Sequence, residues 1–119
     1  MHERPYKRLI AWQESYKLCR MLYESTTAFP NIERFALASQ IRRAAYSMPL
    51  NIAEGAARHS KKEKAHFYAI AIGSLEELHC AIQLSLDLGY ITSETFKAID
   101  DQMNRTSFLI VKLRTSVLP

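Results

Sequence analysis

Two pairs of side chains in this sequence have the spacing of a metal-binding motif of helical bundles. Glu63 precedes His66 by three residues, and Glu76 precedes His79 by three, so each pair would share one face of a helix. Di-iron centres use such pairs from facing helices. Both pairs here fall on one expected helix, about 20 Å apart. We therefore expect no metal site.

No other arrangement of side chains predicts catalysis. The chain has neither a Gly-rich phosphate-binding loop nor a Gly-x-Ser-x-Gly nucleophile motif. Cys19 and Cys80 lack the Cys-x-x-Cys spacing of zinc and redox sites, so plain buried or half-buried thiols are expected. Asn51 and Glu54, with nearby arginines, have the residue types for acid–base work, but a polar network that locks an interface would explain them as well. We expect no enzyme and no cofactor.

Positive charge is concentrated in the first half of the chain. Residues 1–64 contain 12 Lys or Arg against 6 Asp or Glu, whereas residues 65–119 contain 4 against 6. Such basic clusters bind phosphate backbones by counterion release, without sequence specificity, and ordinary solvated surface is the alternative. Cations near a helix N-terminus oppose the helix dipole, which argues against a purely stabilising role. The candidate nucleic-acid-binding residues are Arg42, Arg43, Arg58, Lys61, Lys62 and Lys64.

Prolines, glycines and capping residues divide the chain into four expected helices. Pro30 stops the first helix, a capping box of Ser60 and Glu63 starts the third, and Gly89 ends it. No segment alternates as a strand would. The short connections predict an all-α fold, an antiparallel up-down-up-down four-helix bundle in one domain of residues 1–119. The expected helices span residues 10–29, 35–58, 60–88 and, from Thr92 or Ser93, residues 93–117.

Helical spacing predicts a buried stripe on each helix. The first helix carries Trp12, Tyr16, Cys19, Tyr23 and Thr26; the second carries Leu37, Ile41, Ala44, Met48, Ile52 and Gly55. The third carries Phe67, Ala71, Ser74, Leu78, Ala81, Ser85 and Leu88; the fourth carries Phe96, Ile99, Met103, Thr106, Ile110, Leu113 and Val117.

Pro49 lies inside the second expected helix. Its ring conflicts with the carbonyl of Ala45, and its missing amide removes a hydrogen bond, so we expect a kink there. Ser47 and Asn51 are candidate partners for the carbonyls freed near Ala45 and Tyr46. The kink could shape a binding surface, although a structural bend of the bundle is the favoured interpretation.

The second helix also has an apolar face roughly opposite its core stripe. A helix that is apolar on two sides is usually buried on both, which indicates a subunit interface, while scattered exposed apolar residues are the alternative. On the third helix, small residues at four-residue intervals would let another helix approach, although a tolerated Gly73 explains part of the row. The candidate interface residues are Tyr46, Leu50, Ala53, Ala57, Ala65, Ala69 and Gly73; a polar stripe of Gln40, Ser47, Asn51 and Glu54 runs along the second helix.

An ordered set of short motifs resembles the bacterial four-helix-bundle family whose founding members are encoded in intervening sequences of 23S ribosomal RNA genes. The motifs are Trp12-Gln13, Phe29-Pro30, Glu33-Arg34-Phe35, residues 40–44 (QIRRA), Ser47-Met48-Pro49, residues 51–55 (NIAEG), Arg58, Ser60, Glu63, residues 73–78 (GSLEEL) and Leu88-Gly89-Tyr90. The matching motif residues are Gln40, Arg42, Arg43, Ser47, Pro49, Asn51, Glu54, Gly55 and Arg58, and Met48 stands where the family often has Ile.

This resemblance implies a homopentameric, barrel-like ring without established enzymatic activity. It also implies kinship with the accessory variability protein of diversity-generating retroelements, which partners a reverse transcriptase and nucleic acid. The leading hypothesis is therefore a non-catalytic homo-oligomer that binds RNA or a nucleic-acid-processing protein through its basic surface. The alternative is an oligomeric protein–protein adaptor with no nucleic-acid role. The polar start at Met1 to Tyr6 and the lack of a long apolar run predict no signal peptide, no membrane span and a cytoplasmic location.

Overall fold

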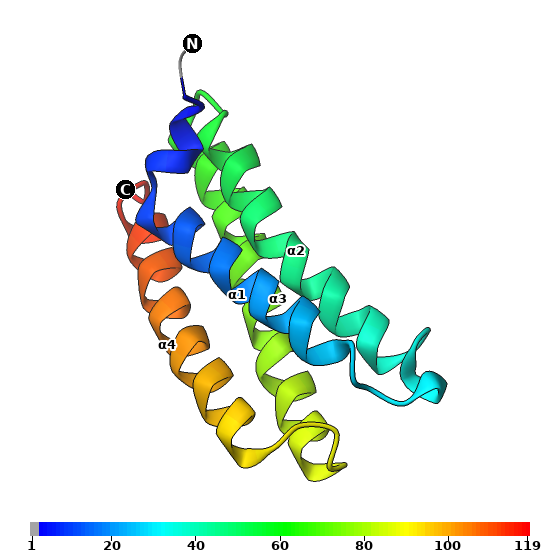
Figure 1. Cartoon of the computed structure of the whole chain (residues 1–119). Coiled ribbons are helices and arrows are strands. Elements are labelled where there is room, and N and C mark those ends of the chain that lie inside the picture. The colour runs from blue at the N-terminus through cyan, green and yellow to red at the C-terminus, as the bar shows by residue number, and fades with distance from the viewer. Residues whose placement is uncertain (1–2) are drawn as a thin grey trace.

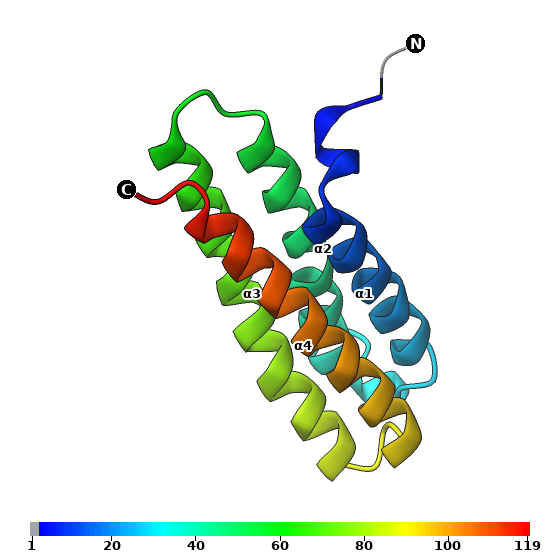
Figure 2. The same cartoon turned by 90° about the vertical axis from the view of Figure 1, so that its left-hand side faces the viewer.

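Four long helices make up most of the structure, a computed structural model that describes residues 3–119 (Figure 1). The elements are η1 (Pro5–Arg8), α1 (Ile10–Thr26), η2 (Asn31–Glu33), α2 (Leu37–Ala56), α3 (Lys61–Asp87) and α4 (Ser93–Thr115). The described residues contain no strand. Consecutive long helices run in opposite directions, as Figures 1 and 2 show, so the predicted all-α four-helix bundle is confirmed. The short helix η1 was not predicted.

Capping residues begin and end α3 and α4 as the sequence indicates. Ser60 Oγ accepts a hydrogen bond from the Glu63 amide at 3.1 Å. The Glu63 carboxylate in turn accepts from the Ser60 hydroxyl at 3.2 Å, rather than from the Ser60 backbone amide as predicted. Thr92 caps α4, because its hydroxyl accepts from the Thr95 amide at 3.1 Å. These bonds satisfy amides that the first helical turn would leave unpaired.

Gly89 ends α3 in the predicted way. Its φ angle is +77°, in the left-handed region, and the Tyr90 amide donates to the Ser85 carbonyl at 2.9 Å. A hydrogen bond that spans five residues after a left-handed glycine is the Schellman motif. This sharp stop turns the chain back into α4.

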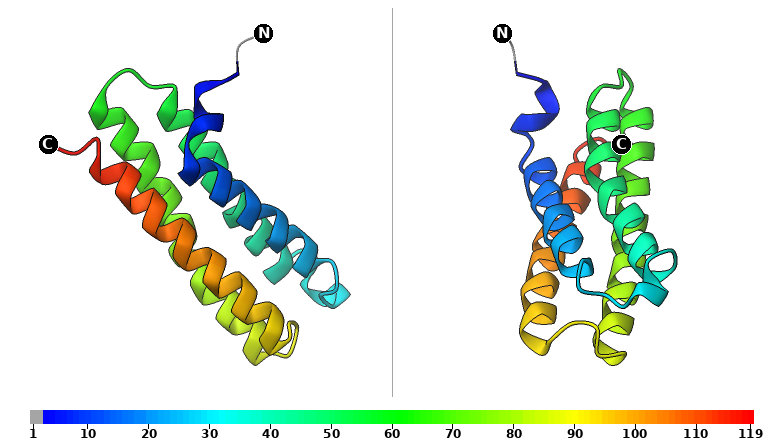
Figure 3. Two further views of the ribbon diagram at one scale, coloured as in Figure 1. Left: turned by 60° about the vertical axis from the view of Figure 1, so that its left-hand side comes forward. Right: turned by 45° about the vertical axis from the view of Figure 1, so that its right-hand side comes forward.

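The bundle is an elongated rod with α2 and α4 at diagonal corners. Each of these helices packs against both α1 and α3, and the backbones of α2 and α4 stay apart across the core (Figure 3). The molecule measures 43 × 32 × 22 Å. α3, at 27 residues, would be about 40 Å long and so runs nearly the full length of the rod.

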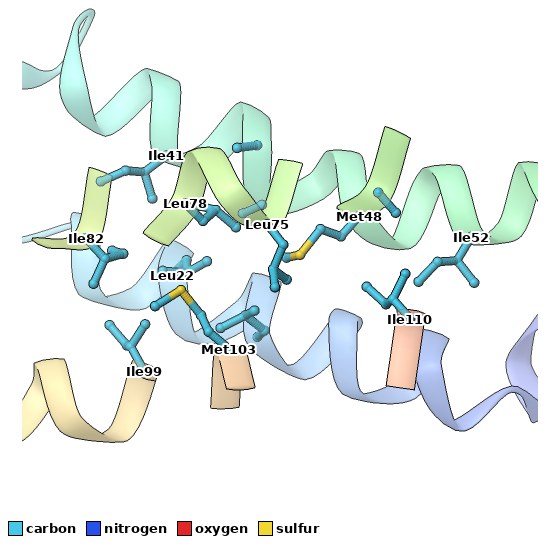
Figure 4. Packing of buried hydrophobic residues seen from close by; sticks show 14 of the residues in the cluster. Leu22, Ile41, Met48, Ile52, Leu75, Leu78, Ile82, Ile99, Met103 and Ile110 are labelled. Atoms are coloured by element: carbon cyan, nitrogen blue, oxygen red, sulfur yellow. The ribbon is translucent and has the colours of Figure 1, made fainter. Parts of the chain in front are cut away.

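Apolar side chains from all four helices meet along the axis of the rod (Figure 4). The predicted core stripe of α2 is confirmed, since Ile41, Met48 and Ile52 are fully buried and Leu37 is half-buried at the helix start. The stripe of α4 is likewise confirmed from Ile99 to Ile110, and its outer members Phe96, Leu113 and Val117 are partly buried against the same core.

The predicted core face of α1 is wrong by one position around the helix. Tyr16 and Tyr23 are exposed, and Trp12 and Cys19 are only half-buried. Of the predicted stripe, Thr26 alone is buried. The residues that enter the core instead are Ala11, Ser15, Leu18 and Leu22. Both stripes have helical spacing, so periodicity could not choose between them, and the smaller residues allow α1 to pack closely against its neighbours.

The predicted seam of α3 is confirmed in part. Ala71, Ser74, Leu78 and Ser85 are buried, whereas Phe67 and Ala81 are half-buried and Leu88 is exposed. The buried side chains missed by the seam are Ala65, Tyr68, Leu75 and Ile82. α3 contacts both α2 and α4, and burial against two neighbours widens the covered arc beyond a single heptad seam.

α2 continues without interruption through Pro49, which is buried. Asn51, one of the two candidate partners for the freed carbonyls, bonds to Ser47 instead, since Asn51 Nδ2 donates to Ser47 Oγ at 3.0 Å. The same amide group donates to the Ser47 carbonyl at 2.8 Å, rather than to the carbonyls of Ala45 or Tyr46 that were expected to need partners. The kink at Pro49 stays a prediction.

None of the helices within residues 3–119 combines the length and the apolar character that a bilayer crossing requires. Two residues of the polar N-terminal start, Met1 and His2, lie outside the described part of the chain.

Candidate functional site

Of the basic residues near the turn between α2 and α3, Arg58 and Lys64 bind back onto their own bundle. The Arg58 guanidinium pairs with Glu54 and lies 4.8 Å above the ring of Phe67. Lys64 Nζ donates to the carbonyl of Ala56 at 3.0 Å, at the C-terminus of α2. An ammonium there offsets the negative end of the α2 dipole, so Lys64 stabilises α2, although it also stands in the first turn of α3. The unfavourable interaction of Lys64 with the N-terminus of α3, expected from the sequence, is therefore partly offset by its favourable interaction with the C-terminus of α2.

Lys61 and Lys62 project from the first turn of α3 into solvent. Both side chains are exposed, and neither makes a salt bridge within residues 3–119. Lys62 borders an open hollow of about 620 Å³ between the α2–α3 turn and the start of α3, which Arg58, His66 and Phe67 also line. This turn is the part of the predicted basic surface whose charges are available to a ligand.

Arg42 joins α2 to the C-terminal end of α1. Its Nε donates to Thr26 Oγ1 at 2.8 Å, its Nη2 donates to the Tyr23 carbonyl at 3.3 Å, and its guanidinium lies 5.1 Å from the centre of the Tyr23 ring. The side chain thus donates to one hydroxyl and one carbonyl at the C-terminal end of α1 and also lies over one aromatic ring. These contacts give Arg42 a structural role that the sequence did not reveal.

Arg43 stays on the surface beside α3. It donates to Gln40 Oε1 at 3.2 Å, and its Nη2 lies 3.9 Å from Glu77 Oε1. Arg43 and Arg58 are 15 residues apart on α2 and its end, which corresponds to about 22 Å along a helix. The six predicted basic residues therefore form two separate groups rather than one continuous patch.

The polar stripe of α2 forms hydrogen bonds within the bundle. Ser74 Oγ on α3 donates to Ser47 Oγ at 2.8 Å, and Ser47 in turn accepts from Asn51. Gln40 pairs with Arg43 on the same helix, and Glu54 pairs with Arg58 just beyond its end. The Ser47–Ser74 bond joins the stripe to α3, and these pairings support the structural interpretation of the side chains over acid–base chemistry.

The second apolar face of α2 remains partly open. Leu50 is 61% exposed and Tyr46 is 42% exposed, while Ala57 is exposed and Ala53 is half-buried. Residues at the N-terminus reach this face, because Pro5 and Tyr6 line an apolar groove with Leu50, Ala53 and Ala57. The sequence missed this contact, although Pro5 and Tyr6 are the kind of residues that could have indicated a short packed element.

The row of small residues on α3 does not share one environment. Ala65 is buried, and its carbonyl accepts a hydrogen bond from Arg114 Nε at 3.3 Å, so its small size already serves packing within the chain. Ala69 is half-buried and Gly73 is exposed. A Cβ built on Gly73 would meet no atom within 4 Å. Only the Gly73 end of the row is open for contact with another copy.

The residues with metal or thiol chemistry do not converge. Within residues 3–119, no three side chains of the His, Cys, Asp and Glu types are close enough to hold a metal ion. Cys19 is half-buried as expected, and burial raises the pKa of its thiol, which disfavours the reactive thiolate. The same expectation is wrong for Cys80, which lies exposed on α3.

Comparisons with known proteins identify a similar solved structure and a matching family. A solved structure from Bacteroides thetaiotaomicron VPI-5482, a protein of unknown function from the S23 ribosomal protein family, matches with a TM-score of 0.78 and 21% identity over 88% of this chain and 98% of that one. At this identity the likeness shows a shared fold. No curated protein matches the chain. A family model described as 23S rRNA-intervening sequence protein matches residues 7–112. That match covers most of the chain and agrees with the four-helix bundle, so the protein belongs to the 23S rRNA-intervening sequence protein family.

Proposed function

We propose that this protein is a non-catalytic homo-oligomer, a pentamer by the family resemblance, that binds RNA through the turn between α2 and α3. The observation that carries the proposal is the exposed pair Lys61 and Lys62, which lacks salt-bridge partners within residues 3–119 while the neighbouring Arg58 and Lys64 are engaged. The family model names a 23S rRNA context and no reaction. An RNA partner also implies a cytoplasmic location.

Two physical points support binding at this turn. Unpaired ammonium groups gain free energy when they release counterions from a phosphate backbone, whereas a paired guanidinium must first give up its carboxylate. An assembly of several copies would repeat the turn once per subunit. Modest affinity at each turn would then increase through avidity, provided that one RNA can reach several turns.

The direct test measures binding of a labelled single-stranded RNA by fluorescence anisotropy at several salt concentrations. We expect the affinity for RNA to fall as the salt concentration rises. In Lys61→Ala/Lys62→Ala, the magnitude of the slope of log K against log salt concentration should decrease by about 1.4, which is about 0.7 for each phosphate contact removed. The control is Lys17→Ala/Lys97→Ala, which removes the same charge from exposed positions on α1 and α4. Absence of salt-dependent binding by the wild type would refute RNA binding, and equal losses in both variants would refute the assigned turn.

Oligomerisation has its own test, independent of RNA. Sedimentation of the wild type should show a species larger than one 13.7 kDa chain, because Tyr46 and Leu50 leave apolar surface uncovered in the single bundle. A monomer at all accessible concentrations would overturn the homo-oligomer.

A protein–protein adaptor is the second candidate, and the link between α1 and α2 favours it. Ile32 and Phe35 stand on this link with 83% and 87% of their surfaces exposed. Large apolar side chains held at such exposure suit a protein partner. If pull-downs return the same proteins after nuclease treatment, and Phe35→Ser abolishes their capture while the lysine variant does not, the adaptor role replaces RNA binding.

A further inference from the structure

Phe108 is an aromatic side chain that points away from the bundle. It is 68% exposed on α4, and Val111 beside it is also exposed. The core side of the same helix carries Met103 and Ile110, which are buried, so Phe108 contributes nothing to the core. An exposed phenylalanine next to an exposed valine is an apolar projection on the outer face of α4.

An apolar groove lies on the opposite side of the molecule, at the outer face of α2. Pro5 and Tyr6 form one wall, Leu50, Ala53 and Ala57 form the other, and Glu54 stands on the rim. The groove has a volume of about 340 Å³. A cavity of roughly 150 Å³ suffices to bind benzene, so a phenyl ring fits this groove. α2 and α4 occupy diagonal corners of the bundle, as Figures 1 and 2 show, so the groove on α2 and Phe108 on α4 lie on different sides of it.

The groove and Phe108 lie at nearly the same height along the bundle axis. The core sets this register, because Ile52 of α2 lies beside Ile110 of α4 (Figure 4). α2 and α4 run in the same direction, so Phe108, two residues before Ile110, is level with position 50 at one end of the groove, and Lys112 is level with position 54. Two copies placed side by side with their bundle axes parallel can therefore bring Phe108 of one copy against the groove of the other.

We propose that Phe108 of one copy inserts into the groove between η1 and α2 of the next copy. This contact rests on the homo-oligomer proposed above and specifies which surfaces join. Lys112 follows Phe108 by one helical turn, so docking brings its ammonium near the Glu54 carboxylate on the rim. The two surfaces are different, so the contact is heterologous and each copy uses both; repetition with a closing rotation produces a ring.

The first experiment compares three charge substitutions by sedimentation. Phe108→Asp and Leu50→Asp should each reduce the wild-type oligomer to the monomer, because each places a charge in an apolar contact. Phe35→Asp introduces the same charge at a more exposed position outside the contact, and it should keep the wild-type mass. Circular dichroism should show the same helix content in all three variants, since all three side chains are largely exposed.

The second experiment tests that two different surfaces meet. In a background with Cys19 and Cys80 replaced by serine, the double variant Glu54→Cys/Lys112→Cys is treated with a flexible bis-maleimide linker. A heterologous contact should join chains into a ladder that extends beyond two subunits, while either single cysteine variant should stay uncrosslinked. If a single variant instead forms dimers, like surfaces meet and the proposed contact is wrong.

The failures of the two proposals are distinguishable. A monomeric wild type would overturn the homo-oligomer and this contact together. An oligomeric wild type whose mass is unchanged by Phe108→Asp would overturn only the contact and leave the homo-oligomer standing. RNA binding at Lys61 and Lys62 is measured separately and can survive either result.

Discussion

The ring of Tyr68 on α3 lies where a side chain on Gly55 would stand. A Cβ on Gly55 would be 2.7 Å from Tyr68 Cε1 and 3.1 Å from the Cβ of Phe67. Tyr68 is buried and has little room to move. Gly55 therefore allows the close approach of α2 and α3 just before the turn that carries Lys61 and Lys62.

Replacing Gly55 with alanine should destabilise the fold. The added methyl group overpacks the contact with Tyr68, and we expect Gly55→Ala to lower the free energy of unfolding by about 1–3 kcal/mol. Urea denaturation, at the same protein concentration for every variant, measures the change.

The matched control for this substitution is Gly73→Ala on α3. Position 73 is helical and has open space around it, so alanine should raise the free energy of unfolding by about 1 kcal/mol through its helix propensity. Opposite signs at the two glycines are the expected result. A neutral or stabilising Gly55→Ala would contradict the close-packing role of Gly55.

Arg42 should behave as a structural residue and Lys62 as a surface residue. Arg42→Ala removes two hydrogen bonds to the end of α1 and a contact with Tyr23, so we expect a loss of about 1–2 kcal/mol in unfolding free energy. Lys62→Ala should change that energy by less than about 0.5 kcal/mol. Thermal and urea unfolding of both variants provide the comparison. Equal stabilities for Arg42→Ala and the wild type would show that the Arg42 contacts do not hold α1 against α2.

The hydrogen bond between Tyr90 and Glu33 should give the protein a pH dependence in the alkaline range. Tyr90 Oη donates to Glu33 Oε2 at 2.8 Å, and this bond, followed by burial and the negative carboxylate, raises the pKa of Tyr90 above its ordinary value. A raised pKa in the fold means that the protonated phenol is favoured there. Its stabilising effect is complete below about pH 10, the ordinary tyrosine pKa, and is lost as the pH rises through the higher folded value.

Tyr90→Phe should therefore lower Tm below about pH 9, and its deficit relative to the wild type should shrink above pH 10. Tyr68, whose pKa is also raised by burial, is present in both proteins and does not enter the difference. Differential scanning calorimetry from pH 7 to pH 11 measures this difference. Tyr16→Phe serves as the control, because Tyr16 is exposed and its hydroxyl makes no hydrogen bond within residues 3–119. A deficit that grew with pH would mean that Glu33 does not hold the phenol in its protonated form.

The two cysteines should differ in their reaction with thiol reagents. Cys19 is half-buried on α1, and burial raises the pKa of its thiol, whereas Cys80 is exposed on α3. Reaction with a chromogenic disulfide at neutral pH should show one fast and one slow thiol, and Cys80→Ser should remove the fast phase. If both thiols reacted equally fast, the Cys19 thiol would be more accessible to the reagent than its packing indicates.

The sequence by itself determined the four long helices, the capped ends of α3 and α4, and the core of α2 and α4. Ser60, Thr92 and Gly89 act through hydrogen bonds and backbone angles that involve only a few neighbouring residues, so local sequence was sufficient to place them. The core stripes of α2 and α4 were legible because each helix has one clear row of large aliphatic residues.

The tertiary structure alone decided which face of α1 is buried and which basic residues remain available. The row with Trp12 and Tyr16 and the row with Leu18 and Leu22 both have helical spacing. Only packing against α2 and α4 decides which of the two rows is buried. Whether an arginine or lysine side chain already has a hydrogen-bond or ion-pair partner depends on residues distant in sequence or on another helix. Arg42, which donates to the Tyr23 carbonyl of α1, is an example. Charge counting shows how many cations the chain has, but their availability to a ligand is set by three-dimensional neighbours.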